Sequence, residues 1–115
     1  MADIRYAVGA VGVRDLNQEL DGLWRELQDP KSALRREADA KGVDLQKVSG
    51  LPRKEAITVR QEGEGFEPVT TAIIVAFSPV VAEIVRDLWR NVFLPRLRKH
   101  KGQDVLGEEK KDKPG

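Results

Sequence analysis

The chain contains 115 residues, enough for one domain with a single modest core. Charged residues make up 34% of it, yet the formal net charge is only +1, which argues against wholesale coating of nucleic acid or anionic lipid. The absence of cysteine excludes disulfides and thiolate metal sites, and the N-terminus lacks the pattern of a secretory signal. We therefore expect a cytoplasmic protein, either free or peripheral to a membrane.

A strand followed by a helix is predicted at the N-terminus. Apolar residues alternate with others over residues 3–8, which is typical of a half-buried strand. Between residues 14 and 28, large apolar residues recur at helical spacing and form one face: Leu16, Leu20, Leu23, Trp24 and Leu27. Gly9 and Gly12 lie between the two elements without the third glycine of a dinucleotide-binding loop, so an ordinary turn is favoured over a phosphate site.

The middle of the chain predicts a short helix and two more strands. Asp29-Pro30 ends the first helix, and residues 31–41 form a mostly solvated helix that Gly42 closes. Val43 and Leu45 indicate a second strand at 43–48, and the alternation around Ile57 indicates a third at 55–61.

Residues 69–85 form an apolar segment that contains one charged residue, Glu83. Its first part, 68–77, is compatible with a helix or a buried strand, although its β-branched residues favour a strand locally. Ser78-Pro79 then predicts the start of an amphipathic helix over 79–99, which Pro95 is expected to kink or end. Residues 102–115 are polar and weakly patterned, and they predict a disordered charged tail after a single domain at 1–101.

The apolar segment must be buried in a core, against a partner or in lipid. A bilayer span needs about 20 predominantly apolar residues, and Glu83, Arg86 and Asp87 interrupt this one. Each charge at the bilayer centre costs roughly 2.5–3.5 kcal/mol on insertion scales. Burial within protein is therefore favoured, with a membrane-associated or membrane-active protein that uses residues 68–94 as the alternative.

No reaction is indicated by the sequence. The single histidine, His100, lies in a basic run and is most simply a surface residue, and a His-rich metal site cannot be built from one histidine and no cysteine. Glu83 is isolated in apolar surroundings, but an ordinary surface pair with Arg86 explains it better than a proton donor. We expect no enzyme activity, no metal and no cofactor.

Four stretches carry a resemblance to a known group: IRYAVGA, DLNQELDGLWRELQD, PVTTAIIVAFSPVVAEIVRDLW and RLRKHK. They resemble small bacterial domains described as effector-associated constant components, which accompany proteases and nucleotide-driven effectors in conflict and defence systems. The chain departs from that group in three ways: residues 42–61 predict two strands, Ser-Pro stands where glycines are expected, and the closing strand is missing. The resemblance implies an adaptor or recognition role beside an effector enzyme and brings no catalytic residues.

The sequence thus predicts an α+β fold: a two- or three-stranded sheet, an N-terminal amphipathic helix and a long C-terminal amphipathic helix. We expect a non-enzymatic module that binds a partner protein, or a second copy of itself, through the apolar face of residues 69–93. The residues predicted to bind the partner are Ile84, Arg86, Leu88, Trp89, Arg90, Val92 and Phe93. The helix exit predicts a basic patch of Arg96, Arg98, Lys99 and Lys101, for which nucleic acid is the less favoured ligand because no reader motif accompanies it.

Overall fold

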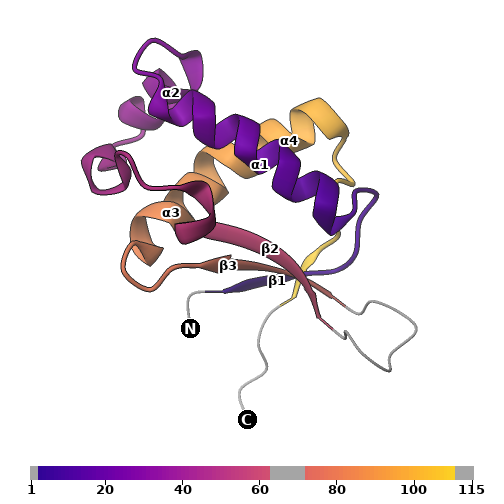
Figure 1. Ribbon diagram of the computed structural model, residues 1–115. Coiled ribbons are helices and arrows are strands. Elements are labelled where there is room, and N and C mark those ends of the chain that lie inside the picture. Colours follow the sequence, from indigo (N-terminus) through magenta and orange to yellow (C-terminus); the bar gives the residue numbers. More distant parts are fainter. Residues whose placement is uncertain (1–2, 63–71, 111–115) are drawn as a thin grey trace.

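The protein has an α+β fold in which helices pack on one side of an antiparallel sheet (Figure 1). The computed structural model describes residues 3–62 and 72–110. The strands are β1 (Ile4–Tyr6), β2 (Ile57–Glu62), β3 (Ala72–Phe77) and β4 (Glu109–Lys110). The helices are α1 (Val13–Gln28), α2 (Ala33–Ala40), α3 (Ala82–Leu88) and α4 (Leu94–Lys101), with short 3-10 helices η1 (Leu45–Val48) and η2 (Arg53–Glu55) and a π-helical turn η3 (Trp89–Phe93).

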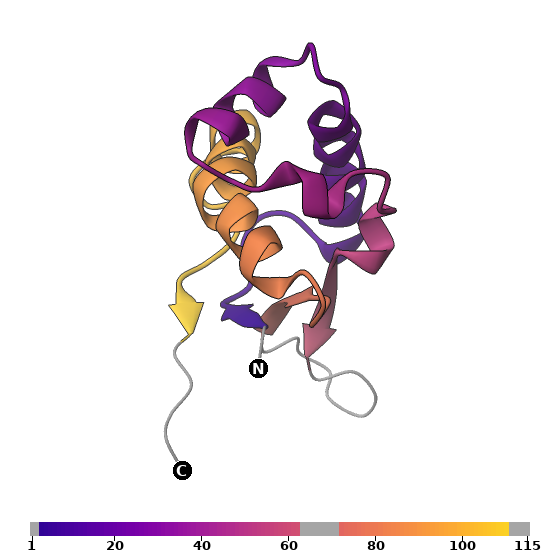
Figure 2. The same cartoon turned by 90° about the vertical axis from the view of Figure 1, so that its left-hand side faces the viewer.

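The described strands lie in the order β2-β3-β1-β4, so β3 is inserted between the two strands that α1 and α2 connect. This is the split β-α-β arrangement of ferredoxin-like sheets. Ile4 pairs with Val75, and Val75 pairs with Val59, so three inward-facing β-branched residues form one row across the sheet. Figure 2 shows the helical layer above the strands.

The predicted second strand at 43–48 is wrong, because Leu45–Val48 is the 3-10 helix η1. Its two buried residues, Leu45 and Val48, are three positions apart. That spacing places them on one side of a 3-10 turn but on opposite faces of a strand. The η1 segment is held against α1, since the Gln28 side-chain amide donates to the Val48 carbonyl at 3.1 Å.

The sequence left a helix and a buried strand both open for residues 68–77. Residues 72–77 form the strand β3. Pairing on both sides, with β1 and with β2, buries the β-branched run that begins at Ile73. Residues 68–71 lie outside the described part of the chain.

The C-terminal helix runs over 82–101 rather than 79–99, and Pro95 does not end it. Proline has no N–H and crowds the carbonyl four residues earlier, here that of Asn91. The helix widens into the π-helical turn η3 just before Pro95, and Leu94 N–H bonds to the Trp89 carbonyl. Lys41 then donates its ammonium group to the Asn91 carbonyl at 2.7 Å and supplies the donor that Pro95 lacks.

The predicted disordered tail is wrong for residues 102–110. Val105 and Leu106 are fully buried, and Ala7 bonds through its N–H and its carbonyl to the backbone of Glu108 and Gly107 at 2.8 Å each. The segment therefore returns to the sheet and adds β4 beside β1, because its two apolar residues complete the core. Residues 111–115 lie outside the described part.

Candidate functional site

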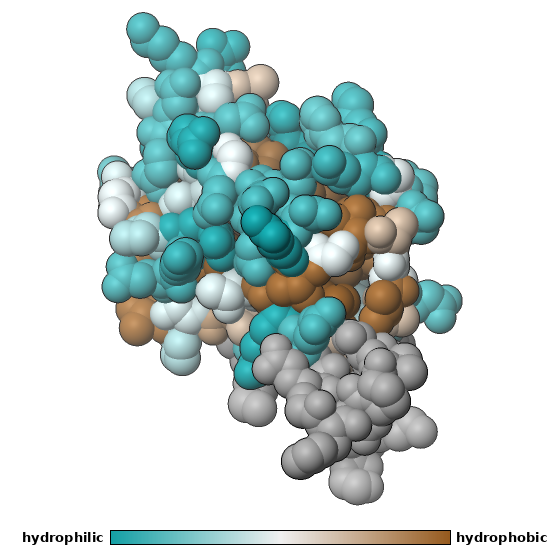
Figure 3. Space-filling view, turned by 45° about the vertical axis from the view of Figure 1, so that its right-hand side comes forward, coloured by the Kyte–Doolittle hydropathy of each residue, from teal (hydrophilic) through white to brown (hydrophobic). Residues whose placement is uncertain are grey.

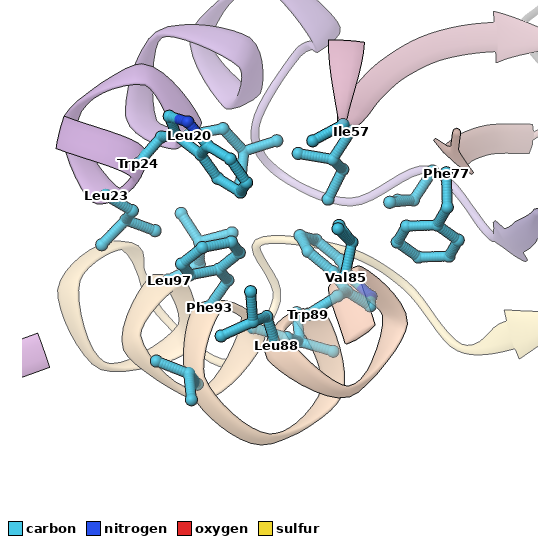
Figure 4. Packing of buried hydrophobic residues seen from close by; sticks show 14 of the residues in the cluster. Leu20, Leu23, Trp24, Ile57, Phe77, Val85, Leu88, Trp89, Phe93 and Leu97 are labelled. Atoms are coloured by element: carbon cyan, nitrogen blue, oxygen red, sulfur yellow. The ribbon is translucent and has the colours of Figure 1, made fainter. Parts of the chain in front are cut away.

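The predicted partner-binding face lies mostly inside the protein. Leu88, Trp89, Val92 and Phe93 are fully buried, and Ile84 is half-buried. Figure 4 shows Trp89 and Phe93 pointing from the C-terminal helix toward side chains of α1, β2 and β3. The prediction that this face binds a partner is therefore wrong for the four buried residues, because the leucine face of α1 and the sheet already cover them.

Trp89 is anchored to the sheet by Tyr6. Its indole N–H donates to the Tyr6 hydroxyl at 2.7 Å, and the two rings meet edge to face with centroids 6.0 Å apart. Burial raises the pKa of Tyr6 above its ordinary value of 10.0 because the phenolate would lose its hydration, although the Trp89 N–H acts in the opposite direction. Phe93 makes a similar edge contact with Trp24 of α1 at 6.2 Å. Both aromatic residues thus have intramolecular partners.

Arg86 and Arg90, which are also predicted to bind the partner, differ in their exposure to solvent. Arg86 is half-buried and Arg90 is exposed. The Arg90 guanidinium donates two bonds to the Glu109 carboxylate, at 3.1 and 3.2 Å, and these bonds raise the pKa of Arg90. Since Glu109 lies in β4, this pair ties the last described strand to the C-terminal helix.

The predicted basic patch is partly neutralised by carboxylates. Arg96 pairs with Glu37 at 3.2 Å, and Lys101 pairs with Glu19 at 3.7 Å. Arg98 is half-buried, whereas Lys99 is exposed. A continuous positive field at the helix exit is therefore weaker than the sequence indicates, which disfavours a polyanion as its ligand.

A polar network that no sequence pattern predicts occupies the outer edge of β2. The Asn17 side-chain amide donates to the Val59 carbonyl at 2.9 Å and accepts from the Val59 N–H at 3.1 Å, as a neighbouring strand would. Arg53 is buried and donates to Asp21 at 2.8 Å, to Asn17 at 3.1 Å and to the Ile57 carbonyl at 3.2 Å. These contacts occupy part of the edge through which sheets add further strands.

The strongest candidate site is a pocket at the end of the sheet where β3 leads into α3. Its volume is about 530 Å³, and we call it the Val80 pocket; it is lined by Lys47, Leu51, Lys54, Glu55, Ser78, Val80 and Val81. Val80 is 91% exposed, whereas Val81, the next residue, is 7% exposed and belongs to the core. An apolar side chain held in water beside an apolar-lined pocket is the typical setting of an interaction site.

The surface elsewhere is mostly hydrophilic on the face that Figure 3 shows, with hydrophobic areas between polar side chains. Val8 is the other large apolar residue that is clearly exposed among the described residues, at 48%. It follows β1 at the opposite end of the sheet from the Val80 pocket, because Ile4 pairs near the end of β3 and Tyr6 near its start.

Three further findings bear on the kind of site. Within residues 3–62 and 72–110, no group of three or more His, Asp or Glu side chains is placed to hold a metal ion. None of the helices in these ranges is long and apolar enough to cross a membrane. Comparisons with protein-family models, with curated proteins and with solved structures found no match to this chain.

Proposed function

We propose that this protein is a non-enzymatic interaction module that binds a partner protein at the Val80 pocket. The observation that carries the proposal is the 91% exposure of Val80 beside an apolar-lined pocket, whereas the other large apolar residues of 72–85 are buried or half-buried. Val80 contributes little to the protein's own core. A partner that covered its side chain would stabilise the complex by about 25 cal/mol per Å² of apolar surface removed from water.

The role beside an effector enzyme rests on the resemblance to the effector-associated group. The strand β4 supports this role, because a closing strand is expected of that group and the sequence alone gave no sign of it. The proposal places the protein in the cytoplasm, where it would bind an effector enzyme at the Val80 pocket. The alternative occupant of the pocket is a second copy of the chain.

The test is affinity capture from the cells that express the protein, with two valine variants as a matched pair. We expect the wild type and Val8→Asp to retain the same partner protein and Val80→Asp to lose it. A carboxylate at position 80 would have to be desolvated on binding, which is costly. Because Val80 is exposed, circular dichroism and denaturant unfolding of Val80→Asp should match the wild type.

Retention of the same protein by Val80→Asp would contradict the proposal, and so would capture of no protein by the wild type. Concentration-dependent dimerisation in size-exclusion chromatography, abolished by Val80→Asp, would show that the partner is a second copy.

A further inference from the structure

Two smaller hollows adjoin the Val80 pocket and extend it into a groove. On one side a hollow of about 190 Å³ shares Lys54 and Ser78 with it and continues over the paired ends of β2 and β3, past Thr58 and Ala76. On the other side a hollow of about 370 Å³ shares Lys47 and Val80 with it and continues past Pro79 to Ile84. Three hollows that share lining residues in succession fit an extended chain segment better than a compact small molecule.

The charges of the groove are concentrated at its two junctions. Lys54 lies where the central pocket meets the arm over β2 and β3, and Lys47 lies where it meets the arm toward α3. Both lysines are exposed, and neither forms an ion pair with another residue in the described part of the chain. Arg53, the residue before Lys54, is not available in this way, because it is buried and paired with Asp21 at 2.8 Å.

Carboxylates are present but occupy other positions. Glu55 borders the central pocket, and Glu83 borders the arm toward α3, and both are exposed. The three hollows together contain two ammonium groups and two carboxylates, so the positive charge is local to the central pocket, where Lys47 and Lys54 stand against Glu55 around a lining of Leu51, Val80 and Val81.

From this arrangement we infer that the groove takes an extended acidic segment of the partner protein, with a large apolar side chain in the central pocket and a carboxylate on each side. The inference rests on the proposed function and specifies the chemistry of the partner. The apolar anchor supplies the burial, while Lys47 and Lys54 fix the register of the segment, because complementary charges at a rim mainly set specificity and association rate.

The test uses a display library of random twelve-residue peptides selected on the immobilised wild-type chain. We expect the selected peptides to carry Asp or Glu on both sides of a large apolar residue. Binding of a selected peptide is then measured by fluorescence anisotropy. Lys47→Glu/Lys54→Glu should weaken binding by roughly tenfold or more, because two attractions become two repulsions. The loss should shrink at high salt.

Lys31→Glu/Lys99→Glu is the matched control, because it changes the net charge equally at exposed lysines outside the groove. It should leave binding of the peptide nearly unchanged. Equal losses of peptide affinity in the two double variants would show that Lys47 and Lys54 act only through long-range electrostatic attraction. That result would overturn the inference.

Failure of the inference and failure of the proposed function give different results. Peptides without acidic enrichment, whose binding is lost in Val80→Asp but kept in Lys47→Glu/Lys54→Glu, would overturn the acidic partner and leave the Val80 pocket as the binding site. Peptides that bind Val80→Asp as well as the wild type would overturn both.

Discussion

Replacing Trp89 by alanine is expected to lower the free energy of unfolding by about 3–5 kcal/mol, as for other large aromatic residues removed from cores. Trp89 is completely buried, and its removal also leaves the Tyr6 hydroxyl without its indole donor. A domain of this size has roughly 5–15 kcal/mol of stability in total. Urea unfolding followed by circular dichroism measures the loss, and the variant should unfold at a clearly lower urea concentration than the wild type.

Val80→Ala is the matched control, since Val80 belongs to the same predicted apolar face, residues 69–93, but is 91% exposed. Its stability should remain within about 0.5 kcal/mol of the wild type. If Trp89→Ala were as stable as Val80→Ala, Trp89 would not belong to the core. That result would favour the prediction that Trp89 binds a partner.

Replacing Gly9 by alanine should destabilise the protein by at least about 1–3 kcal/mol, the range of overpacked sites. A Cβ at this position would lie 2.5 Å from the Asp104 carbonyl oxygen and 2.6 Å from the Leu106 Cα. These are backbone atoms and cannot rotate away, so the C-terminal segment would have to move from β1. Thermal unfolding measures the effect, which we expect as a clear fall in melting temperature.

Gly22→Ala provides the opposite control. Gly22 lies within α1, and a Cβ there would meet nothing within 4 Å, so alanine should stabilise the helix by about 0.5–1 kcal/mol. If Gly9→Ala raised the melting temperature as Gly22→Ala does, the close crossing of residues 104–106 over Gly9 would be absent in solution.

The sequence predicted those elements whose pattern is local. The helix α1 follows from the spacing of Leu16, Leu20 and Leu27, and all three are buried as their periodicity indicates. The β-branched run of β3 favours a strand locally, but the sequence left a helix and a strand both open for residues 68–77. The segment at 43–48 was misassigned because its apolar residues are too few to distinguish a period of two from a period of three.

Other features depend on contacts between distant residues, which no local pattern encodes. The helix continues through Pro95, and Lys41 supplies a donor for the carbonyl of Asn91, fifty residues later in the chain, which the proline leaves without an N–H partner. Residues 102–110 return to the sheet because Val105 and Leu106 find space in a core formed by earlier elements. Two apolar residues in a polar stretch are a weak signal for that outcome.

The candidate site shows most clearly that a local sequence pattern does not encode contacts between distant residues. An amphipathic stripe shows that Trp89 and Phe93 are covered, but it cannot show whether the chain or a partner covers them. Val80 and Val81 are identical in type and adjacent in sequence, yet the turn after Ser78 leaves one in water and places the other in the core. The sequence pattern therefore locates the apolar stretch but cannot tell its exposed residue, Val80, from its buried ones.

The titration of Tyr6, the only tyrosine of the chain, tests most directly whether the protein itself covers Trp89. Burial against Trp89 raises the pKa of Tyr6 in the folded state, so the stability it contributes is complete below pH 10 and is lost as the pH rises above that value. We predict that phenolate absorbance of the isolated, folded chain develops at a higher pH than in urea, where Tyr6 should titrate near its ordinary pKa. Coincidence of the two titrations, with circular dichroism showing the chain still folded, would contradict the account.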